Sequence, residues 1–371
     1  MKIGLLTLHT FYNYGAMLQA YATQIVLTQM GYDVQLINHY PLDLEKQNDT
    51  VPLSLHPKKL ILYFILKFDR KYQQKLKRFR DFRKVFNLTK RYYSEEEIYN
   101  HPPKFDVYII GSDQVWNMEN GIDPFCFLDF VKGHGKKISY APSFGSSSIP
   151  EKYKPRLTEL LSDFSAISTR EDDGVRIIKE ATGRDAVQVL DPTLLISKTE
   201  WNNLIGHTKP PTAKYILIYA LNDSDESAKM VEAVRNRYNL PVWGIPMGVN
   251  VPAKFKVEKS FKDAGPLEFI SLFMHAKVVL TSSFHGLAFA VNFEKTFFVV
   301  PHPTRNSRLN SLMKLLDLQD RQYFTPEIIN SLKESELFLD YSTKIYILNN
   351  QRKQSCDFLT ASIENIPPLT K

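Results

Sequence analysis

Cysteine is almost absent from this chain, which has only Cys126 and Cys356 among its 371 residues. Two cysteines so far apart in sequence give neither a disulfide framework nor a cysteine-based metal site, and this usage is typical of a reducing compartment. Long apolar runs are absent too, because no stretch reaches the roughly 18 residues of a membrane span. We interpret the N-terminal MKIGLLTLHT as a buried strand rather than a signal peptide. The predicted location is therefore cytoplasmic.

Several motifs with a known catalytic mechanism are also missing. The chain has no phosphate-binding P-loop, no H-E-x-x-H zinc motif, no nucleophile elbow and no C-x-x-C pair. The stretch HTFYNYGAMLQAYA, 9–22, starts a helix but lacks the G-x-G-x-x-G fingerprint of dinucleotide binding. No metal ion and no cofactor is predicted.

Charge is spread unevenly. The formal net charge is +7, yet 58–91 alone holds 13 Lys/Arg and two acids, about +11, which leaves about −4 for the rest. The chain as a whole is therefore not typical of a nucleic-acid-binding protein. Within 63–86, apolar residues recur at helical spacing and cations crowd the other faces. Either an inserted helix packs this apolar stripe on the N-terminal domain, or its basic face docks peripherally on the anionic inner face of a membrane.

Strand-like apolar runs alternate with helix-period segments along the whole chain. KIGLLTL (2–8), a helix over 15–30 and DVQLIN (33–38) predict a βαβ unit, with Gly31 ending the helix. Further strands are predicted at 105–111, 137–142, 164–169, 186–190, 215–221, 241–246, 276–282 and 296–301. This alternation predicts an α/β fold of two doubly wound, Rossmann-like domains with parallel sheets.

The domain boundary is placed at the polar, proline-containing stretch 199–214. Residues 1–200 are predicted to form an N-terminal Rossmann-like domain with a basic helical insertion at about 55–100. Residues 212–325 are predicted to form a C-terminal Rossmann-like domain, and 326–371 a helical tail.

Polar side chains follow nearly every predicted strand. Ligands of doubly wound sheets bind beyond the carboxyl ends of the strands. The residues at these ends are His9, Thr10, Asn13, Gly15, Ser112, Asp113, Ser143, Gly145, Arg170, Glu171, Asp191, Ser282, Ser283, His285, His302, Thr304 and Arg305. The pattern favours a functional edge, although loops are polar in most proteins.

A histidine stands at a predicted strand-to-helix corner in TSSFHGLAFA, 281–290. The two serines occupy the position of a helix N-cap, and the amides of a first helical turn bind anions. A histidine in that turn can hydrogen-bond a phosphate or move a proton, which makes His285 a candidate acid–base group. The alternative is a capped helix with a structural histidine.

Two further motifs suggest ligand contacts. In IIGSDQVWN, 109–117, polar side chains lie beside a tryptophan, a combination that often holds a sugar; the alternative is an Asx-type turn with a core tryptophan. Arg170 ends a predicted strand, and Arg305 and Arg308 are spaced for one helical face. Arginine suits bidentate contact with carboxylate or phosphate, although each arginine alone is more often a surface salt-bridge partner.

Taken in order, five motifs resemble the polysaccharide pyruvyl transferase family. They are NYGAMLQAYA (13–22), DVYIIGSDQVWN (106–117), ISTRED (167–172), VLDPTLL (189–195) and TSSFHGLAFAVNF (281–293). No single motif is specific to this family, but the set of five in this order is quite specific. The resemblance covers about residues 3–320.

The resemblance implies a fold similar to the two-domain glycosyltransferase B architecture. It also implies transfer of a pyruvyl group from phosphoenolpyruvate to two hydroxyls of a cell-surface polysaccharide or its lipid-linked precursor, which gives a cyclic ketal and phosphate. The family's histidine corresponds to His285 and the arginine of its I-S-x-R-E strand to Arg170. The N-terminal domain is then expected to bind the acceptor and the C-terminal domain the donor.

Under this scheme His285 moves the protons, and Asp113 orients or deprotonates an acceptor hydroxyl. The expected donor contacts are Arg170, Ser282, Ser283, Gly286, Arg305 and Arg308. The expected acceptor contacts are Asn13, Gln19, Gln114, Trp116 and Asn117.

The chain departs from the family pattern at Ser283, where many members carry an arginine. Arg305 and Arg308 are the candidates to replace that arginine. Two other functions stay open. One is a glycosyltransferase that uses a nucleotide-sugar donor on the same fold, and the other is a non-catalytic sugar-binding protein of capsule assembly.

Overall fold

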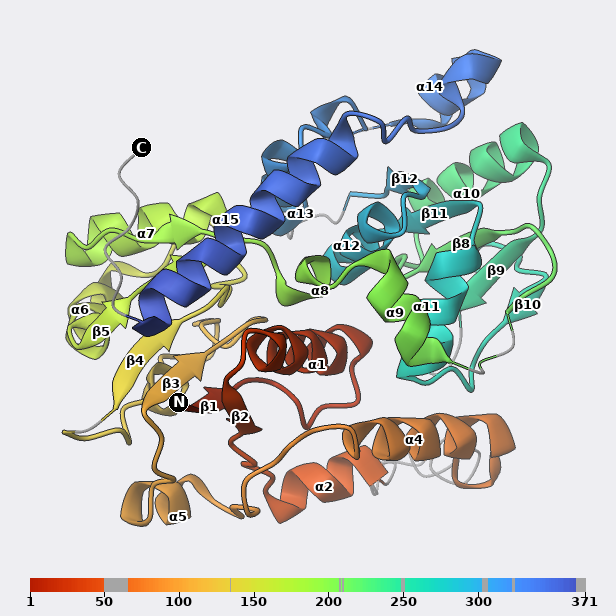
Figure 1. Ribbon diagram of the computed structural model, residues 1–371. Coiled ribbons are helices and arrows are strands. Elements are labelled where there is room, and N and C mark those ends of the chain that lie inside the picture. The colour runs from red at the N-terminus through yellow and green to blue at the C-terminus, as the bar shows by residue number, and fades with distance from the viewer. Residues whose placement is uncertain are drawn as a thin grey trace. The chain divides into compact units, whose positions relative to one another are not determined.

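The computed structural model describes residues 1–49, 66–133, 135–206, 208, 210–247, 251–301, 306–321 and 324–364. The chain divides into two compact units. The first comprises Met1–Pro52, Arg83–Ile196 and Asn349–Lys371, and the second comprises Leu53–Phe82 and Ser197–Leu348. Figure 1 follows the helices and strands of both units in colour, from red at the N-terminus to blue at the C-terminus.

A parallel sheet forms the centre of the first unit. Its described strands are β1 (Lys2–Leu6), β2 (Asp33–Leu36), β3 (Val107–Ile110), β4 (Lys136–Ser139) and β5 (Phe164–Ala166), in the spatial order β2-β1-β3-β4-β5. β3 is buried at every residue, as expected for a parallel strand covered on both faces. Because β1 pairs with β2 on one side and β3 on the other, the strand order reverses between β1 and β3. Such a reversal is where doubly wound folds bind ligands.

Helices complete the first unit. α1 (Tyr14–Gln29) packs against β2 and against α8 (Pro192–Leu195). The remaining elements are α2 (Leu42–Asp49), α5 (Glu95–Asn100), α6 (Lys154–Leu161), α7 (Asp172–Thr182), the two-stranded sheet of β6 (Ser168–Thr169) and β7 (Val187–Gln188), the 3-10 helices η1 (Pro124–Phe127) and η2 (Glu151–Tyr153), and α15 (Lys344–Glu364) from Asn349 onward. The Ser355 hydroxyl accepts the Leu190 amide at 3.0 Å and so fastens α15 beside the end of β7.

The second unit has a sheet of the same kind. Its described strands are β8 (Ile216–Tyr219), β9 (Val242–Ile245), β10 (Lys259–Ser260), β11 (Val278–Thr281) and β12 (Thr296–Val299), in the order β10-β9-β8-β11-β12 and all parallel. Its helices are α4 (Arg70–Arg83) as far as Phe82, α9 (Lys198–Ile205), α10 (Asp225–Tyr238), α11 (Pro266–His275), α12 (Phe284–Asn292), α13 (Ser307–Leu315), α14 (Pro326–Ser331), and the 3-10 helices η3 (Gln319–Arg321) and η4 (Glu334–Glu336). The strand order reverses between β8 and β11.

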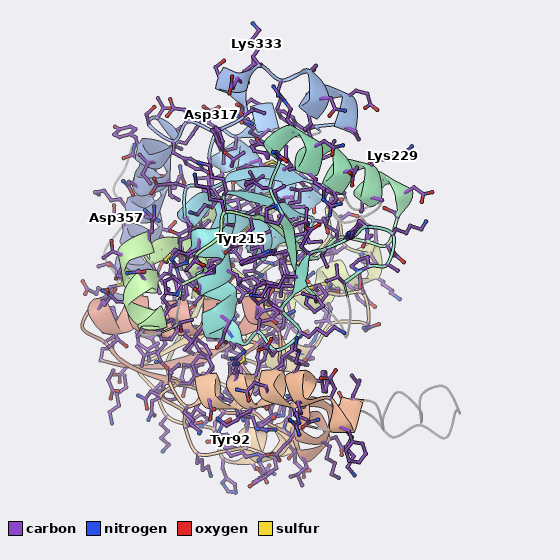
Figure 2. The ribbon with its side chains drawn as sticks, turned by 90° about the vertical axis from the view of Figure 1, so that its right-hand side faces the viewer. Tyr92, Tyr215, Lys229, Asp317, Lys333 and Asp357 are labelled. Carbon is purple, nitrogen blue, oxygen red and sulfur yellow. The ribbon has the colours of Figure 1, made fainter. Side chains whose placement is uncertain are left out.

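Aromatic side chains fill part of the second unit's interior. Tyr215 is fully buried and stacks on Trp243 with ring centroids 4.0 Å apart. It donates its hydroxyl hydrogen to the Leu272 carbonyl at 2.7 Å, which satisfies the polar group that a buried tyrosine carries. By contrast with the buried Tyr215, Lys229 on α10 is exposed. Figure 2 labels Tyr215 and Lys229.

The predicted α/β fold with two Rossmann-like parallel sheets is confirmed, and each predicted strand run contains a strand. The structure differs at the predicted linker, 199–214, which includes most of α9. Ser197 and Glu200 form a capping box that starts this helix, and Trp201 is buried against Phe289. The chain therefore divides before α9 rather than after it.

Two other segments are grouped differently from the sequence prediction. α4, expected to pack on the N-terminal domain, belongs to the second unit as far as Phe82. The predicted tail, 326–371, is shared between the units, with α14 in the second and most of α15 in the first; 365–371 lie outside the described residues. Within the described ranges, we find no helix with the length and apolar character needed to cross a membrane.

Candidate functional site

Gln19 lies where the strand order of the first sheet reverses. Its side-chain nitrogen donates to the Thr7 hydroxyl and to the Ala16 carbonyl, both at 2.8 Å. Its side-chain oxygen accepts the Ser112 amide at 3.2 Å. Gln19 is fully buried, so its amide ties the end of β1 to the end of β3. This corrects the predicted acceptor contact at Gln19.

Arg170 is the centre of a buried ionic network at the same edge of the sheet. Its Nη1 donates to Asp191 at 2.9 Å, its Nε donates to Glu171 at 3.0 Å, and its Nη2 lies 3.5 Å from Asp113. Burial alone would lower the pKa of Arg170, but the charges of Glu171, Asp113 and Asp191 outweigh that effect and raise it. The arginine is therefore held as a cation by three carboxylates.

The partners of Asp191 show how complete this network is. One carboxylate oxygen accepts the Thr193 amide at 3.0 Å and the Thr193 hydroxyl at 2.7 Å. The other accepts the Ser112 hydroxyl at 3.0 Å and the Arg170 guanidinium. Because three carboxylates already surround the guanidinium, an incoming anion would meet like charge. The contact of Arg170 with the donor's carboxylate or phosphate stays a prediction, against which this network argues.

Asp113 is the most accessible carboxylate of the network. Its side chain is 13% exposed, compared with 4% for Glu171 and 0% for Asp191. Its backbone has φ 65° and forms an isolated parallel bridge with Pro142 beyond the end of β4, in which the Ser143 amide donates to the Asp113 carbonyl at 2.8 Å. Asp113 therefore remains a candidate to contact an acceptor hydroxyl.

The side-chain amides of Gln114 and Asn117 both lie close to the backbone of Gly145. A Cβ atom at Gly145 would lie 2.2 Å from Gln114 Nε2 and 3.0 Å from Asn117 Nδ2, and the backbone there has φ 72°. Only glycine fits this close approach in the left-handed region. Both amides are half-buried, so they remain candidates for polar contacts with a ligand.

Two other predicted acceptor contacts have structural roles. Trp116 is 1% exposed, stacks on Phe127 with ring centroids 5.1 Å apart, and donates its indole nitrogen to the Cys126 carbonyl at 3.0 Å. A ring inside the core cannot pack on a sugar, which corrects that prediction. Asn13 is exposed and caps α1, where its side chain accepts the Ala16 amide at 3.1 Å.

His9 follows β1 and is buried at 1% exposure. Its Nδ1 lies 3.0 Å from the Thr7 carbonyl, which can only accept, so Nδ1 carries the proton of the ring. Burial lowers the pKa of His9 to about 4; the Thr7 hydrogen bond opposes this shift and the nearby Arg83 charge adds to it. His9 is therefore neutral near pH 7.

Acidification is expected to destabilise the first unit through His9. An unfolded histidine titrates near pH 6.5, so a folded pKa of about 4 means that folding disfavours protonation. The contribution of His9 to the free energy of unfolding is fully present above about pH 6.5. As the pH falls toward 4, the free energy of unfolding decreases by about 3 kcal/mol. Unfolding free energies measured across this window should decline more steeply for the wild type than for His9→Gln. Parallel declines in the two proteins would contradict the assignment.

The corner between β11 and α12 is the candidate site of the second unit. The Ser283 hydroxyl caps α12 by accepting the Gly286 amide at 3.4 Å, and the Ser283 amide donates to Thr281 Oγ1 at 3.0 Å. A Cβ atom at Gly286 would lie 2.2 Å from Thr281 Oγ1, so glycine lets the first turn of α12 pack directly on the strand end. Ser282 donates its hydroxyl hydrogen to the Ala220 carbonyl, which joins this corner to the end of β8.

His285 occupies the first turn of α12, as the sequence predicts. Its side chain is 8% exposed and meets the Phe284 ring edge-on, with ring centroids 5.3 Å apart. α13 packs against α12 and carries the half-buried Arg308 in its own first turn. The structure thus places Arg308 on the neighbouring helix, whereas Arg305 and the rest of 302–305 lie outside the described residues.

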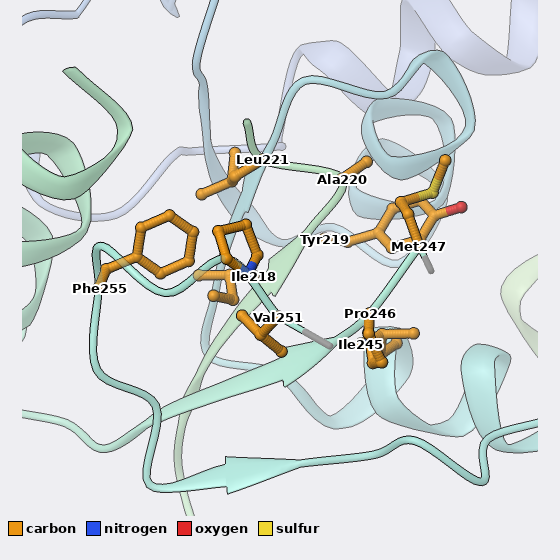
Figure 3. Close-up of a pocket in the computed structure, with 10 residues that line it drawn as sticks. Ile218, Tyr219, Ala220, Leu221, Ile245, Pro246, Met247, Val251 and Phe255 are labelled. Atoms are coloured by element: carbon orange, nitrogen blue, oxygen red, sulfur yellow. The ribbon is translucent and has the colours of Figure 1, made fainter. Parts of the chain in front are cut away.

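An apolar pocket opens at the carboxyl ends of β8 and β9 (Figure 3). Its volume is about 100 Å³, and it is lined by Ile218, Tyr219, Ala220, Leu221, Ile245, Pro246, Met247, Val251, Pro252 and Phe255. None of these lining side chains is charged, so the pocket offers no countercharge to an anionic ligand. In the part of the chain that the structure describes, no three His, Cys, Asp or Glu side chains gather as a metal site.

Comparison with protein families identifies the chain. A family model described as Polysaccharide pyruvyl transferase matches residues 13–303. The chain belongs to the polysaccharide pyruvyl transferase family. This is an enzyme family of polysaccharide biosynthesis, so the resemblance that the ordered motifs indicate is confirmed. No curated protein matches the chain significantly.

Several solved structures are similar to this pyruvyl transferase family member. Arabidopsis thaliana UGT89C1 complexed with UDP-L-rhamnose has a TM-score of 0.51 at 10% identity, with 98% of each chain covered. A putative UDP-N-acetylglucosamine 2-epimerase from Listeria monocytogenes has a TM-score of 0.49 at 10% identity, covering 99% of this chain and 97% of that one. E. coli heptosyltransferase WaaC with ADP has a TM-score of 0.39 at 12% identity, covering 84% and 90%. The likeness to UGT89C1 supports an architecture similar to that of glycosyltransferase B proteins, and at 10% identity it concerns the fold alone.

Proposed function

We propose that this member of the family transfers a pyruvyl group from phosphoenolpyruvate to two hydroxyls of one sugar, forming a cyclic ketal and releasing phosphate. The acceptor is a cell-surface polysaccharide or its lipid-linked precursor. The observation that carries the proposal is the position of His285. It lies in the first helical turn after β11, beside the point where the second sheet reverses its strand order.

The donor requires positive potential, because phosphoenolpyruvate carries a carboxylate and a phosphate. The first turn of α12 supplies backbone amides at the positive end of a helix dipole, held in place by the Ser283 cap and the close contact at Gly286. Arg308 on the adjacent α13 supplies a guanidinium. In this proposal Arg308 takes over the anion contact of the arginine that many members carry at the position of Ser283.

The proposed reaction requires protonation of the methylene carbon of phosphoenolpyruvate and addition of two sugar hydroxyls to the neighbouring carbon. His285 donates a proton to the methylene carbon of phosphoenolpyruvate while the first sugar hydroxyl adds to the neighbouring carbon, and the proton of that hydroxyl then restores His285. The second hydroxyl adds to the same carbon as the C–O bond to phosphate breaks, and its proton leaves with the phosphate. A histidine suits both steps, because it can donate and accept protons near neutral pH.

The first unit supplies acceptor contacts in the same proposal. Asp113 has the most accessible carboxylate of its network, and the half-buried amides of Gln114 and Asn117 meet over Gly145. A carboxylate accepts a hydroxyl hydrogen, and amides both donate and accept, which together suits a sugar.

Binding of phosphoenolpyruvate is expected to raise the thermal unfolding temperature, and Arg308→Ala should remove most of this shift. Ligands that bind only the folded state stabilise it by mass action. Lys229→Ala, at an exposed position of α10, removes one positive charge from the same unit and should keep the shift. An unchanged shift in Arg308→Ala would exclude Arg308 as a donor contact.

The glycosyltransferase alternative is decided by the same titration with nucleotide sugars. Stabilisation by a nucleotide sugar together with none by phosphoenolpyruvate would replace the proposed reaction with glycosyl transfer. Product analysis with phosphoenolpyruvate and lipid-linked or nitrophenyl sugars then tests the reaction itself. The proposal requires a product that carries a pyruvate ketal, with phosphate released in equal amount.

A further inference from the structure

The outer face of α4 is densely cationic. The exposed cations from just before the helix to just after it are Lys67, Arg70, Lys71, Lys77, Arg80 and Lys84. Two acids lie in the same segment. Asp69 accepts the amides of Lys71 and Tyr72 at the helix start, and Asp81 pairs with Lys77 at 2.6 Å. The face therefore keeps a strong excess of positive charge.

The opposite face of α4 is packed within the second unit. Leu76, Phe79 and Phe82 are buried. The helix meets the start of α11 so closely that a Cβ atom at Gly265 would lie 2.4 Å from the Cβ of Arg78. α4 is thus held as a helix by the protein itself, and its cationic face needs no partner to form.

Two cations of the segment are removed from the outer face by this packing. Arg78 binds Asp263 at 2.9 Å and Glu268 at 3.1 Å. Lys75 is 8% exposed, and burial lowers its pKa to about 8. Neither side chain can contribute fully to binding at the outer face, although the sequence pattern groups both with the other basic residues.

Phe68 stands at the N-terminal end of the cationic face and is 75% exposed. The turn that presents it is fixed. Leu66 is buried, its carbonyl accepts the Gln73 side chain at 3.1 Å, and Asp69 caps the following turn. A large aromatic ring is therefore held in solvent between Lys67 and Arg70.

We propose that this surface, the outer face of α4 together with Phe68, docks on an anionic lipid bilayer. Interfacial helices combine cations that attract anionic headgroups with aromatic rings that enter the boundary between headgroups and acyl chains. A polyanionic polysaccharide would engage the same cations, and the comparison of Phe68 variants on vesicles and on heparin distinguishes it from a bilayer. The inference goes beyond the proposed reaction and does not depend on it. Of the basic segment 58–91, the part over 58–65 lies outside the described residues and carries none of this argument.

Co-sedimentation with lipid vesicles tests the proposal. The wild type is expected to bind phosphatidylcholine vesicles that contain about 30% phosphatidylserine, and binding should fade as salt is raised. Replacing Lys67, Arg70, Lys71 and Arg80 with glutamine should weaken binding by about tenfold or more. The matched control replaces Lys46, Lys132, Lys179 and Lys353, which are 58–74% exposed and lie outside α4, so the loss of net charge is identical. This control should bind nearly as the wild type does.

Phe68 distinguishes a bilayer from a soluble polyanion. Phe68→Ser is expected to weaken vesicle binding but to leave binding to heparin unchanged. Phe68→Trp should shift its emission to shorter wavelength on anionic vesicles and not on pure phosphatidylcholine. Absence of vesicle binding, equal losses in the two quadruple variants, or heparin binding with no response at Phe68 would each overturn the proposal.

Discussion

Replacing His285 with alanine is expected to lower turnover by roughly 100-fold or more, the scale of a lost general acid–base group. The protein should still fold, because the Ser283 cap and the close packing of Gly286 on Thr281 hold the first turn of α12 without the imidazole. Phosphoenolpyruvate should still raise the unfolding temperature, since the helix amides and Arg308 remain. The measurement is phosphate release from phosphoenolpyruvate with a sugar acceptor.

A second variant separates catalysis from packing. His285→Gln fills much of the same space and can form hydrogen bonds, but it cannot exchange a proton near neutral pH. It should therefore be as slow as His285→Ala. His275→Ala, on α11 of the same unit, serves as the control and should keep wild-type turnover. Wild-type turnover in a folded His285→Gln protein would exclude the catalytic role.

The positions of the strands and of the β11–α12 corner could be predicted from sequence because both depend on local patterns. Apolar runs bounded by turn residues predict strands, and serines before an apolar helix predict a cap. β10 is two residues long, too short to give a periodic signal, and it was not predicted. α9 was not predicted because its polar sequence resembles a linker; the signal that could have found it is the capping box between Ser197 and Glu200.

The roles of single side chains at strand ends were harder to predict, because they depend on partners distant in sequence. In the sequence, Trp116 has the neighbours of a sugar-binding aromatic residue. In the structure, its indole nitrogen donates to the Cys126 carbonyl and its ring stacks on Phe127. A chain position beyond a strand indicates that a residue lies at the functional edge, but it does not indicate whether its side chain faces a ligand or another strand.

Arg170 shows most clearly that a side chain's role depends on partners distant in sequence. Replacing Arg170 is expected to destabilise the first unit strongly. Arg170→Met would leave Asp191 and Glu171 buried at 0% and 4% exposure without their cation. Removing one partner of a buried ionic group costs about 3–5 kcal/mol, because the remaining charges stay desolvated. Hydrogen exchange of β3 and β4 should become faster, since Ser112 and Asp113 at the end of β3 belong to the network.

Three comparisons show whether the lost stability comes from the ionic network. Arg176→Met, on α7 of the same unit, removes an arginine whose pairs with Asp173 and Glu180 lie at the surface, and it should cost less than about 1 kcal/mol. Adding Asp191→Asn to Arg170→Met removes one uncompensated carboxylate and should restore part of the stability. Arg170→Lys keeps the charge but loses the planar fork that reaches separate carboxylates, so its stability should fall between wild type and Arg170→Met. A fully stable Arg170→Lys protein that no longer responds to phosphoenolpyruvate would instead support the predicted role of Arg170 as a donor contact.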